Sequence, residues 1–309
     1  MQSIAANVWK LDLPIPGSGP ATVAAYLLRA DDGGLHLIDP GWGEAHSMTF
    51  MTTALESLGS TLADVTSVIV THFHPDHLGF ARELQRRGVP LTLPAREQQA
   101  IREERDRMPV RHISLHAQYE RWGVPREVAN ELITTFDYLD APDVQPDVML
   151  EDLEQLAIPG FDLHLVATPG HTDGHGCYVE LRRELLFSGD HILSEMNSGI
   201  GLGGASPDPL QSYLESLEKL AIYDQFQLLP GHGEHRPTVG DRRKALLAHH
   251  HERSREIEQL LESAPSQTTW ELASRVRWSG GWAGLHGTHL ASALTQTAQH
   301  RTRLETLQA

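Results

Sequence analysis

The segment THFHPDHLGF, residues 71–80, constrains this chain most, because it places three histidines and an aspartate within six positions directly after the apolar run SVIV. In an extended segment His72 and His74 point to the same side, so together they can bind one ion. Asp76 and His77 follow where the chain turns into a helix, which directs them towards a second position. The segment therefore predicts the floor of a metal site that needs further ligands from elsewhere.

Three later apolar runs supply such ligands in the same local context. VATPGHTDGH contains His171, LLFSGD ends in Asp190 and LLPGHG contains His232, each just past a predicted strand. A chance match to HxHxDH in a chain of this length is on the order of one in several hundred. Five histidines and two aspartates exceed what one tetrahedral ion requires, whereas two ions that share a bridging carboxylate would use them all.

The remaining pattern predicts an α/β protein. ATVAAYLLRA and GLHLID favour strands, and SMTFMTTALESLG favours a helix that Ser47 would cap. Residues 95–148 interrupt this alternation with helical patterns, and the chain from residue 241 onward is helical in pattern throughout. Asp208 before Pro209 predicts the start of a further helix, and Thr268 with Glu271 three residues later has the spacing of a capping box.

At this point the motifs resemble a known family. THFHPDHLG, TPGHTDGH, FSGD and PGHG, with LIDPG upstream, resemble the metallo-β-lactamase superfamily in order and context over about residues 7–240. The resemblance implies an αββα sandwich with two metal ions at one edge of its two sheets. It implies that the first ion is held by His72, His74 and His171, the second by Asp76, His77 and His232, that Asp190 bridges both, and that Asp39 and His175 support the ligands.

The resemblance also implies a division of the chain. Residues 1–240 would form the metal-binding domain, with residues 95–148 inserted as a helical lid, and residues 241–309 would form a winged-helix-like C-terminal domain. One departure is Phe80, where the family commonly has a second glycine. Asp190 disfavours β-lactamase activity, because the family's β-lactamases have another residue at its position.

The implied chemistry is hydrolysis. Two divalent ions can share a water and lower its pKa towards neutrality, so that hydroxide attacks an electrophilic centre. Asp76 would orient the nucleophile or pass a proton to the leaving group. We expect a carboxylic ester, thioester or lactone as substrate and zinc as the metal, with iron or manganese as alternatives. A phosphodiesterase or ribonuclease with the same metals is a second possibility, and a metal-stabilised module that binds nucleic acid or a partner is a third.

The predicted insertion suggests where a substrate would bind. Its aromatic residues would line an apolar acyl-binding surface or would only attach the inserted helices to the body. The glycine-rich segment SEMNSGIGLGG after Asp190 would form a pocket wall or a plain connection. The four aromatic candidates are Tyr119, Trp122, Phe136 and Tyr138.

Composition limits the kinds of molecule that the chain is expected to bind. The formal net charge of −16 argues against a general attraction to nucleic acid or to anionic lipid, so we expect a small-molecule substrate and no membrane association. The single cysteine, Cys177, excludes an intrachain disulfide and fits a reducing compartment. We expect a cytoplasmic protein that can form a homodimer.

Overall fold

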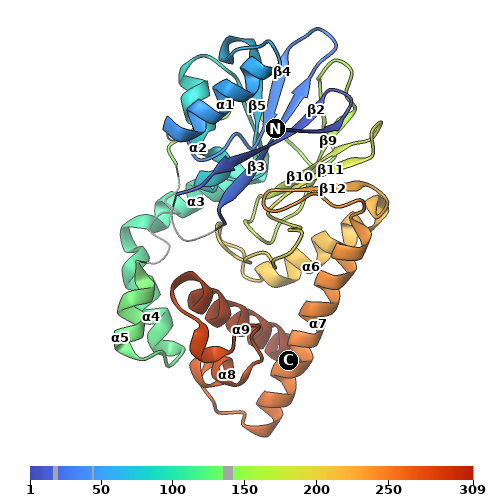
Figure 1. Ribbon diagram of the computed structural model, residues 1–309. Coiled ribbons are helices and arrows are strands. Elements are labelled where there is room, and N and C mark those ends of the chain that lie inside the picture. Colours follow the sequence, from blue (N-terminus) through green and yellow to red (C-terminus); the bar gives the residue numbers. More distant parts are fainter. Residues whose placement is uncertain (17–19, 44, 135–141, 309) are drawn as a thin grey trace.

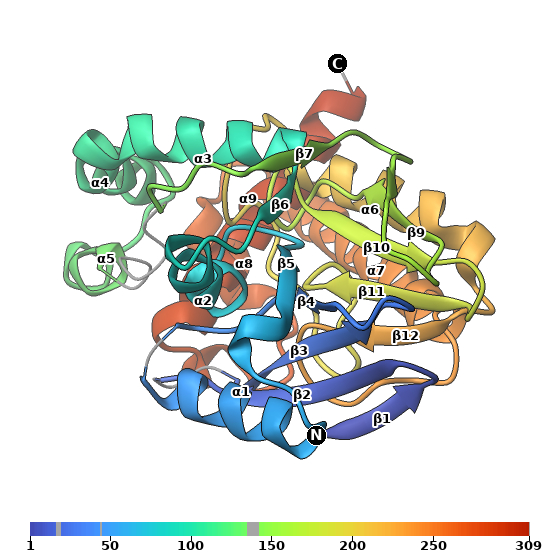
Figure 2. The ribbon, with the colours of Figure 1, turned by 90° about the horizontal axis from the view of Figure 1, so that it is seen from above.

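The computed structural model describes residues 1–16, 20–43, 45–134 and 142–308. In these residues two β-sheets lie face to face with helices on both outer sides, and the helices of the insertion and of the C-terminal segment form the lower part of the molecule (Figure 1). Figure 2 shows the stacked layers from above. The predicted αββα sandwich with a helical insertion and a helical C-terminal segment is therefore confirmed.

The first sheet has the strand order β1-β2-β3-β4-β5-β6-β7. Strands β1 to β4 pair antiparallel, whereas β4, β5, β6 and β7 run parallel to one another. The segments that follow β4, β5 and β6 therefore leave the sheet at the same edge. The strands are β1 (Gln2–Ala5), β2 (Val8–Pro14), β3 (Thr22–Arg29), β4 (Leu35–Ile38), β5 (Val65–Ile69), β6 (Leu91–Pro94) and β7 (Val148–Leu150).

The second sheet has the order β12-β11-β10-β9-β8. Strand β10 is antiparallel to both β9 and β11, and β12 is parallel to β11, so β9, β11 and β12 share one direction and end at one edge. These strands are β8 (Gln155–Leu156), β9 (Leu163–Ala167), β10 (Gly176–Glu180), β11 (Leu185–Gly189) and β12 (Gln227–Pro230).

Alternating side chains in the strands build the layers. In β3, Tyr26 and Leu28 face the second sheet and pack with Phe187, whereas Ala25 and Leu27 belong to the core under the outer helices. This period of two is what a strand buried on both faces requires. Helices α1 (Ala45–Ser57), α2 (Pro75–Arg86) and α3 (Ala95–Arg107) cover the first sheet, and α6 (Pro209–Lys219) and the start of α7 (Gly240–Ser263) cover the second.

The insertion and the C-terminal helices share a core of their own. Helices α4 (Arg111–Arg121) and α5 (Arg126–Ile133) pack against α8 (Thr269–Arg275) and α9 (Gly287–Gln308) through one apolar cluster that includes Leu132 and Leu294. Figure 1 shows both groups of helices below the sandwich. Short 3-10 turns occupy Leu62–Asp64, Met108–Val110, Leu220–Tyr223 and Trp282–Gly284. The proposed boundary at residue 240 lies at the start of α7, and the division into domains stays a prediction.

Several local predictions are confirmed and others are wrong. The side chain of Asp208 accepts a hydrogen bond from the backbone N–H of Gln211 at the start of α6, and Thr268 and Glu271 form the capping box of α8. Helix α1 begins at Ala45, so Ser47 lies inside its first turn and is not its cap. Helix α4 and strands β1, β2 and β7 were not predicted.

The C-terminal residues 241–308 contain no strand, and among the described residues no helix has both the length and the apolar content to span a bilayer.

Candidate metal centre

The segment after β5 turns at once into helix α2, and this turn separates its four candidate ligands. His74 occupies the position before the helix, Pro75 its first position and Asp76 its first turn, where a carboxylate is favoured by the helix dipole. Gly79 lets α2 approach the segment after β4, since a Cβ there would lie 2.1 Å from the carbonyl oxygen of Trp42. Phe80, the departure from the family pattern, is buried in the core.

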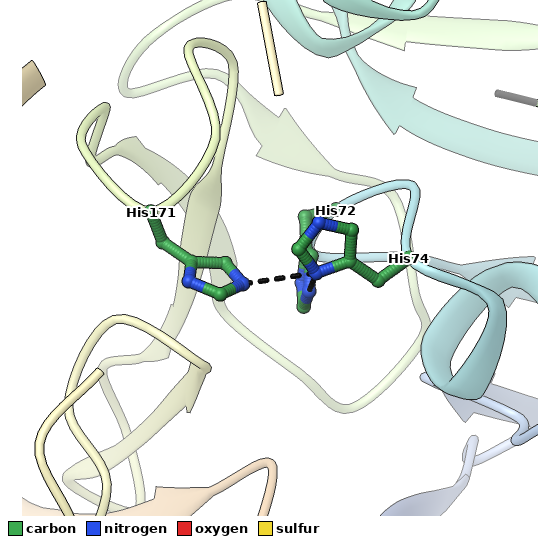
Figure 3. Close-up of side chains that lie close together, drawn as sticks. All are labelled: His72, His74 and His171. Carbon is green, nitrogen blue, oxygen red and sulfur yellow. Dashed lines mark hydrogen bonds between the residues drawn. The ribbon is translucent and has the colours of Figure 1, made fainter. Parts of the chain in front are cut away.

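The first group of ligands consists of His72, His74 and His171 (Figure 3). Nε2 of His72 and Nε2 of His171 each lie 3.0 Å from Nδ1 of His74. All three side chains are buried. Three imidazole nitrogens that meet without an intervening carboxylate are typical of a divalent transition-metal site.

The other ring nitrogen of each histidine has a partner in the protein. Nδ1 of His72 lies 2.9 Å from Oγ1 of Thr71, and the carbonyls of Leu202 and Gly199 accept from Nε2 of His74 at 2.9 Å and from Nδ1 of His171 at 2.7 Å. A backbone carbonyl can only accept, so the ring nitrogen that faces it carries the proton. The opposite nitrogen is then left with a free lone pair directed at the other ligands, which is how proteins fix metal-binding histidines.

The second group consists of Asp76, His77 and His232. Oδ2 of Asp76 lies 3.2 Å from Nε2 of His232 and 3.7 Å from Nε2 of His77. The outer nitrogens are again held, because Nδ1 of His77 donates to Oδ2 of Asp39 at 2.9 Å and Nδ1 of His232 donates to the carbonyl of Thr22 at 2.8 Å.

Asp190 lies between the two groups. Its Oδ1 is 3.4 Å from Nε2 of His77 and 3.5 Å from Nε2 of His232, and its Oδ2 is 3.8 Å from Nε2 of His171. The structure therefore brings all seven candidate ligands together and places the carboxylate that would bridge two ions where it reaches both groups.

The chemistry of these residues fits bound divalent cations. Nε2 of His77 and Oδ1 of Asp190 are buried and have no hydrogen-bond partner, although buried polar atoms normally have one. Burial disfavours positive charge on His232, yet Asp190 and Asp76 raise the pKa of His232 to about 10. The site therefore attracts positive charge in a buried position, and its nitrogen and carboxylate donors suit zinc and related metals.

Comparison with known proteins agrees with this geometry. The family model described as "Metallo-beta-lactamase superfamily" matches residues 18–232. The chain belongs to the metallo-β-lactamase superfamily. This match covers every candidate ligand and ends at His232, so the C-terminal helices lie outside it.

Relatives extend the comparison. The chain is 24% identical over 246 residues to the Beta-lactamase-like protein 2 homolog of Caenorhabditis elegans, a match over 78% of this chain and 67% of that one. It is 25% identical to the Hydroxyacylglutathione hydrolase GloC of Haemophilus influenzae, over 71% of this chain and 89% of that one. The chain spans 57% to 67% of the length of the first curated relatives it matches.

A solved structure resembles the whole chain. The metallo-beta-lactamase family protein TTHA1429 of Thermus thermophilus superimposes with a TM-score of 0.79 at 27% identity, over 99% of this chain and 96% of that one. The likeness therefore includes the insertion and the C-terminal helices. Membership of the metallo-β-lactamase superfamily together with the assembled histidines and aspartates supports a metal-dependent hydrolase.

The two predicted supporting residues of the metallo-β-lactamase site lie beside the ligands. Asp39 has a positive φ of 52° and accepts from the backbone N–H and the hydroxyl of Thr71 at 2.8 Å each, as well as from His77. The ring centroids of His175 and His72 are 5.1 Å apart, and Nδ1 of His175 is 2.9 Å from Oγ1 of Thr168. Asp39 thus fixes the ligand loop directly, whereas His175 packs behind it.

Glu97, at the start of α3, is a supporting residue that sequence analysis missed. Its carboxyl group accepts from the backbone N–H of Phe73 at 2.8 Å and from the hydroxyl of Thr172 at 2.9 and 3.0 Å, so it ties the loop after β5 to the loop after β9. Glu97 is fully buried, and this burial raises its pKa to about 8. The surrounding sequence, AREQQAIREE, has the pattern of an ordinary charged helix and does not single Glu97 out.

The four aromatic candidates for the substrate pocket divide into two pairs. Tyr119 is 3% exposed and belongs to the core shared by the insertion and the C-terminal helices, and Trp122 packs against that core beside Trp270. These contacts fit the alternative in which the aromatic residues only attach the inserted helices. Phe136 and Tyr138 lie outside the described residues, so a pocket role for them stays a prediction.

Proposed function

We propose that this chain is a binuclear metal-dependent hydrolase that cleaves a carboxylic ester, thioester or lactone. The observation that carries the proposal is the position of Asp190, whose carboxylate lies within 3.8 Å of ligand nitrogens of both groups. His72, His74 and His171 would hold one ion, and Asp76, His77 and His232 the other. We propose zinc, with iron and manganese as the alternatives that metal analysis would detect.

Bound divalent ions would supply Lewis-acid chemistry and a water of lowered pKa. The protein supplies the rest. The side chain of Asp76 is 17% exposed, which is more than the 13% of Asp190. Burial opposes its ionisation, but His77 and His232 lower the pKa of Asp76, so the carboxylate is ionised. It can therefore accept a proton from the attacking water and pass it to the leaving group.

Two observations favour a carbonyl substrate over a polynucleotide. The acidic chain, with a formal net charge of −16, repels phosphodiester backbones. The relative from Haemophilus influenzae is named as a hydrolase of hydroxyacylglutathione, which is a thioester, and it matches over 89% of its own length. A cytoplasmic location and a homodimer stay predictions from the sequence.

The test is a substrate panel on protein stripped of metal and reloaded with zinc, iron(II) or manganese(II). The panel contains a nitrophenyl ester, an S-hydroxyacyl glutathione, an aliphatic lactone, a nitrophenyl phosphodiester and RNA. We expect turnover of a carbonyl substrate with two equivalents of metal bound. Turnover of the phosphodiester or RNA alone would replace this proposal with the nuclease alternative, and metal binding without any turnover would favour a binding module.

Asp76→Asn separates an enzyme from a binding module. The variant keeps the shape of the side chain but cannot accept a proton, so hydrolysis should fall by about 100-fold or more while the fold is retained. Asp106→Asn, at an exposed position of α3, is the matched control and should hydrolyse the substrate like the parent. Equal rates for both variants would remove Asp76 from the mechanism.

A further inference from the structure

The loop that follows Asp190 contacts the metal ligands through its backbone. The carbonyl of Gly199 accepts from His171, and the carbonyl of Leu202 accepts from His74. The hydroxyl of Ser198 also lies 3.1 Å from Nδ1 of His171. Residues 193–202, here called the orienting loop, therefore fix the ring orientation of two of the three histidines in the first group.

The same loop is held from the other side by the C-terminal helices. Arg242, in the first turn of α7, donates from Nε to the carbonyl of Leu193 and from Nη2 to the carbonyl of Met196, at 2.6 Å each. Its Nη2 also lies 3.1 Å from Oδ1 of Asn197. Gln299 of α9 donates from Nε2 to the carbonyl of Ile200 at 3.0 Å, directly next to Gly199.

The orienting loop is exposed only in its middle, since Leu193, Ser194, Ser198 and Ile200 are buried and Ile200 packs in the core under α6 and α7. Residues 195–197 are exposed and border a hollow of about 880 Å³ whose other walls come from α7, α9 and the segment 277–289. Elsewhere the loop is bonded to the body, since Gly201 and Leu202 donate to the carbonyls of Gly170 and His171 and Ser194 contacts the carbonyl of Glu234. The contacts from α7 therefore hold the exposed residues of the loop, and the contact from α9 holds the backbone next to Gly199.

We propose that Arg242 and Gln299 are positioning residues of the metal centre, through which α7 and α9 set the geometry of His171 and His74. The C-terminal helices then complete the first metal position instead of forming an independent module. This inference rests on the metal centre of the proposed function. It concerns the affinity of one of two metal positions, and not the identity of the substrate.

The experiment compares neighbouring arginines. Arg242→Ala removes the contacts to the orienting loop. Arg243→Ala is the matched control, because Arg243 projects from the same turn of α7 but pairs with Asp224 and donates to the carbonyl of Leu217 in the body. Both variants lose buried or half-buried contacts of α7, so thermal unfolding should report destabilisation in both. Only Arg242→Ala should change metal binding.

Stepwise binding of zinc and cobalt(II) is measured by competition with a chromophoric chelator. Loss of a residue that orients a metal ligand typically weakens metal binding 10- to 100-fold, so for Arg242→Ala we expect about a tenfold loss in one of the two binding steps. The cobalt(II) spectrum of that position should change as well. Gln299→Ala should weaken the same step, and Arg242→Lys, which keeps the charge but not the forked donor geometry, should restore it only partly.

Unchanged stepwise affinities in Arg242→Ala and Gln299→Ala would overturn the inference. An equal loss in Arg243→Ala would also overturn it, since the effect would then follow from general destabilisation. If Arg242→Ala does not fold, Gln299→Ala and Arg242→Lys carry the same test. Failure of the parent protein to bind two metal ions would instead overturn the proposed function.

Discussion

Buried histidines cluster at the edge of the sandwich and also between helices α7 and α9. At the sandwich edge, His77 and His232 have a carboxylate within 3.7 Å of Nε2 and an acceptor on Nδ1. Between the helices, His250 and His300 stack with their ring centroids 5.7 Å apart and are each 1% exposed. Burial is thus the same in both places, and the neighbouring groups differ.

The neighbours of His77 and His232 give these two histidines electrostatics opposite to those of the helix pair, whereas burial lowers the pKa of His72, His74 and His171 at the same sandwich edge. Asp190 and Asp76 raise the pKa of His232 to about 10 despite its burial. Burial, together with the nearby His249 and Arg253, lowers the pKa of His250 to about 3. Neither nitrogen of His250 has a hydrogen-bond partner, and His250 and His300 belong to no group of three potential ligands in the described part of the chain.

This difference indicates which buried histidines are suited to bind a metal ion. An acceptor on one nitrogen sets the tautomer and the ring orientation, and carboxylates make the other side attractive to a cation. The sandwich edge supplies both, because strands β4, β5, β9, β11 and β12 all end at this edge. Between the helices no carboxylate of the described residues pairs with either ring, although the hydroxyl of Ser254 lies 2.8 Å from Nδ1 of His300, so these histidines act as polar core residues.

The largest effect is expected when the carboxylate between the two groups of ligands is altered. Asp190→Asn keeps the shape of the side chain but removes the charge shared by both ligand groups. We expect bound metal to fall below two equivalents and hydrolysis to fall by more than the roughly 100-fold that loss of a supporting residue costs. Metal analysis after gel filtration and the substrate panel measure both effects.

The control for this variant comes from the other histidine set. His250→Phe replaces an equally buried ring and should retain the metal content and rate of the parent. Loss of metal in His250→Phe to the same extent as in Asp190→Asn would contradict the distinction between the two sets.

A smaller effect is expected when an orienting acceptor is altered and the ligands are kept. Asp39→Asn preserves a residue type that tolerates the positive φ of this position, but it removes the charge that faces Nδ1 of His77. We expect the affinity for the second ion to fall 10- to 100-fold with the first ion little affected. Chelator competition resolves the two steps, and equal loss at both would show that Asp39 supports the loop as a whole.

The clustering of the candidate ligands could be predicted from the sequence because four of them directly follow apolar strands. His72, His171, Asp190 and His232 therefore inherit their positions from sheet topology, which strand patterns reveal. Helix α6 and the capping box of α8 were predictable for a similar reason, since Asp208 and Thr268 act on residues three positions away.

The parts that were missed depend on contacts that carry no local pattern. Glu97 acts through a backbone N–H 24 residues away, and the carbonyls of Gly199 and Leu202 could belong to any residue type. His191, directly after Asp190, is fully buried with its ring centroid 5.7 Å from that of His175 and 4.6 Å from that of Tyr213, contacts that no local pattern indicates. Tyr119 packs on helices that lie far along the chain, a pairing that only the tertiary fold determines.

The smallest expected effect concerns only the free energy of unfolding. It tests the two histidines between α7 and α9. Burial lowers the pKa of His250 to about 3 and that of His300 to about 2, from an ordinary value of 6.5. Below pH 6.5 the unfolded chain binds protons at these positions that the folded chain does not, so stability is lost as the pH falls. Between pH 6.5 and pH 5 each histidine should reduce the free energy of unfolding by roughly 1.5 kcal/mol.

Urea unfolding of the parent and of His250→Phe at pH 7, 6.5 and 5 measures this difference. The variant lacks one titrating group, so its stability should fall less steeply with acid, whereas its stepwise metal affinities at pH 7 should equal those of the parent. Parallel pH profiles would mean that His250 takes up a proton in the folded chain. The histidines between α7 and α9 would then resemble His77 and His232 in charge, and only the neighbouring carboxylates would distinguish them.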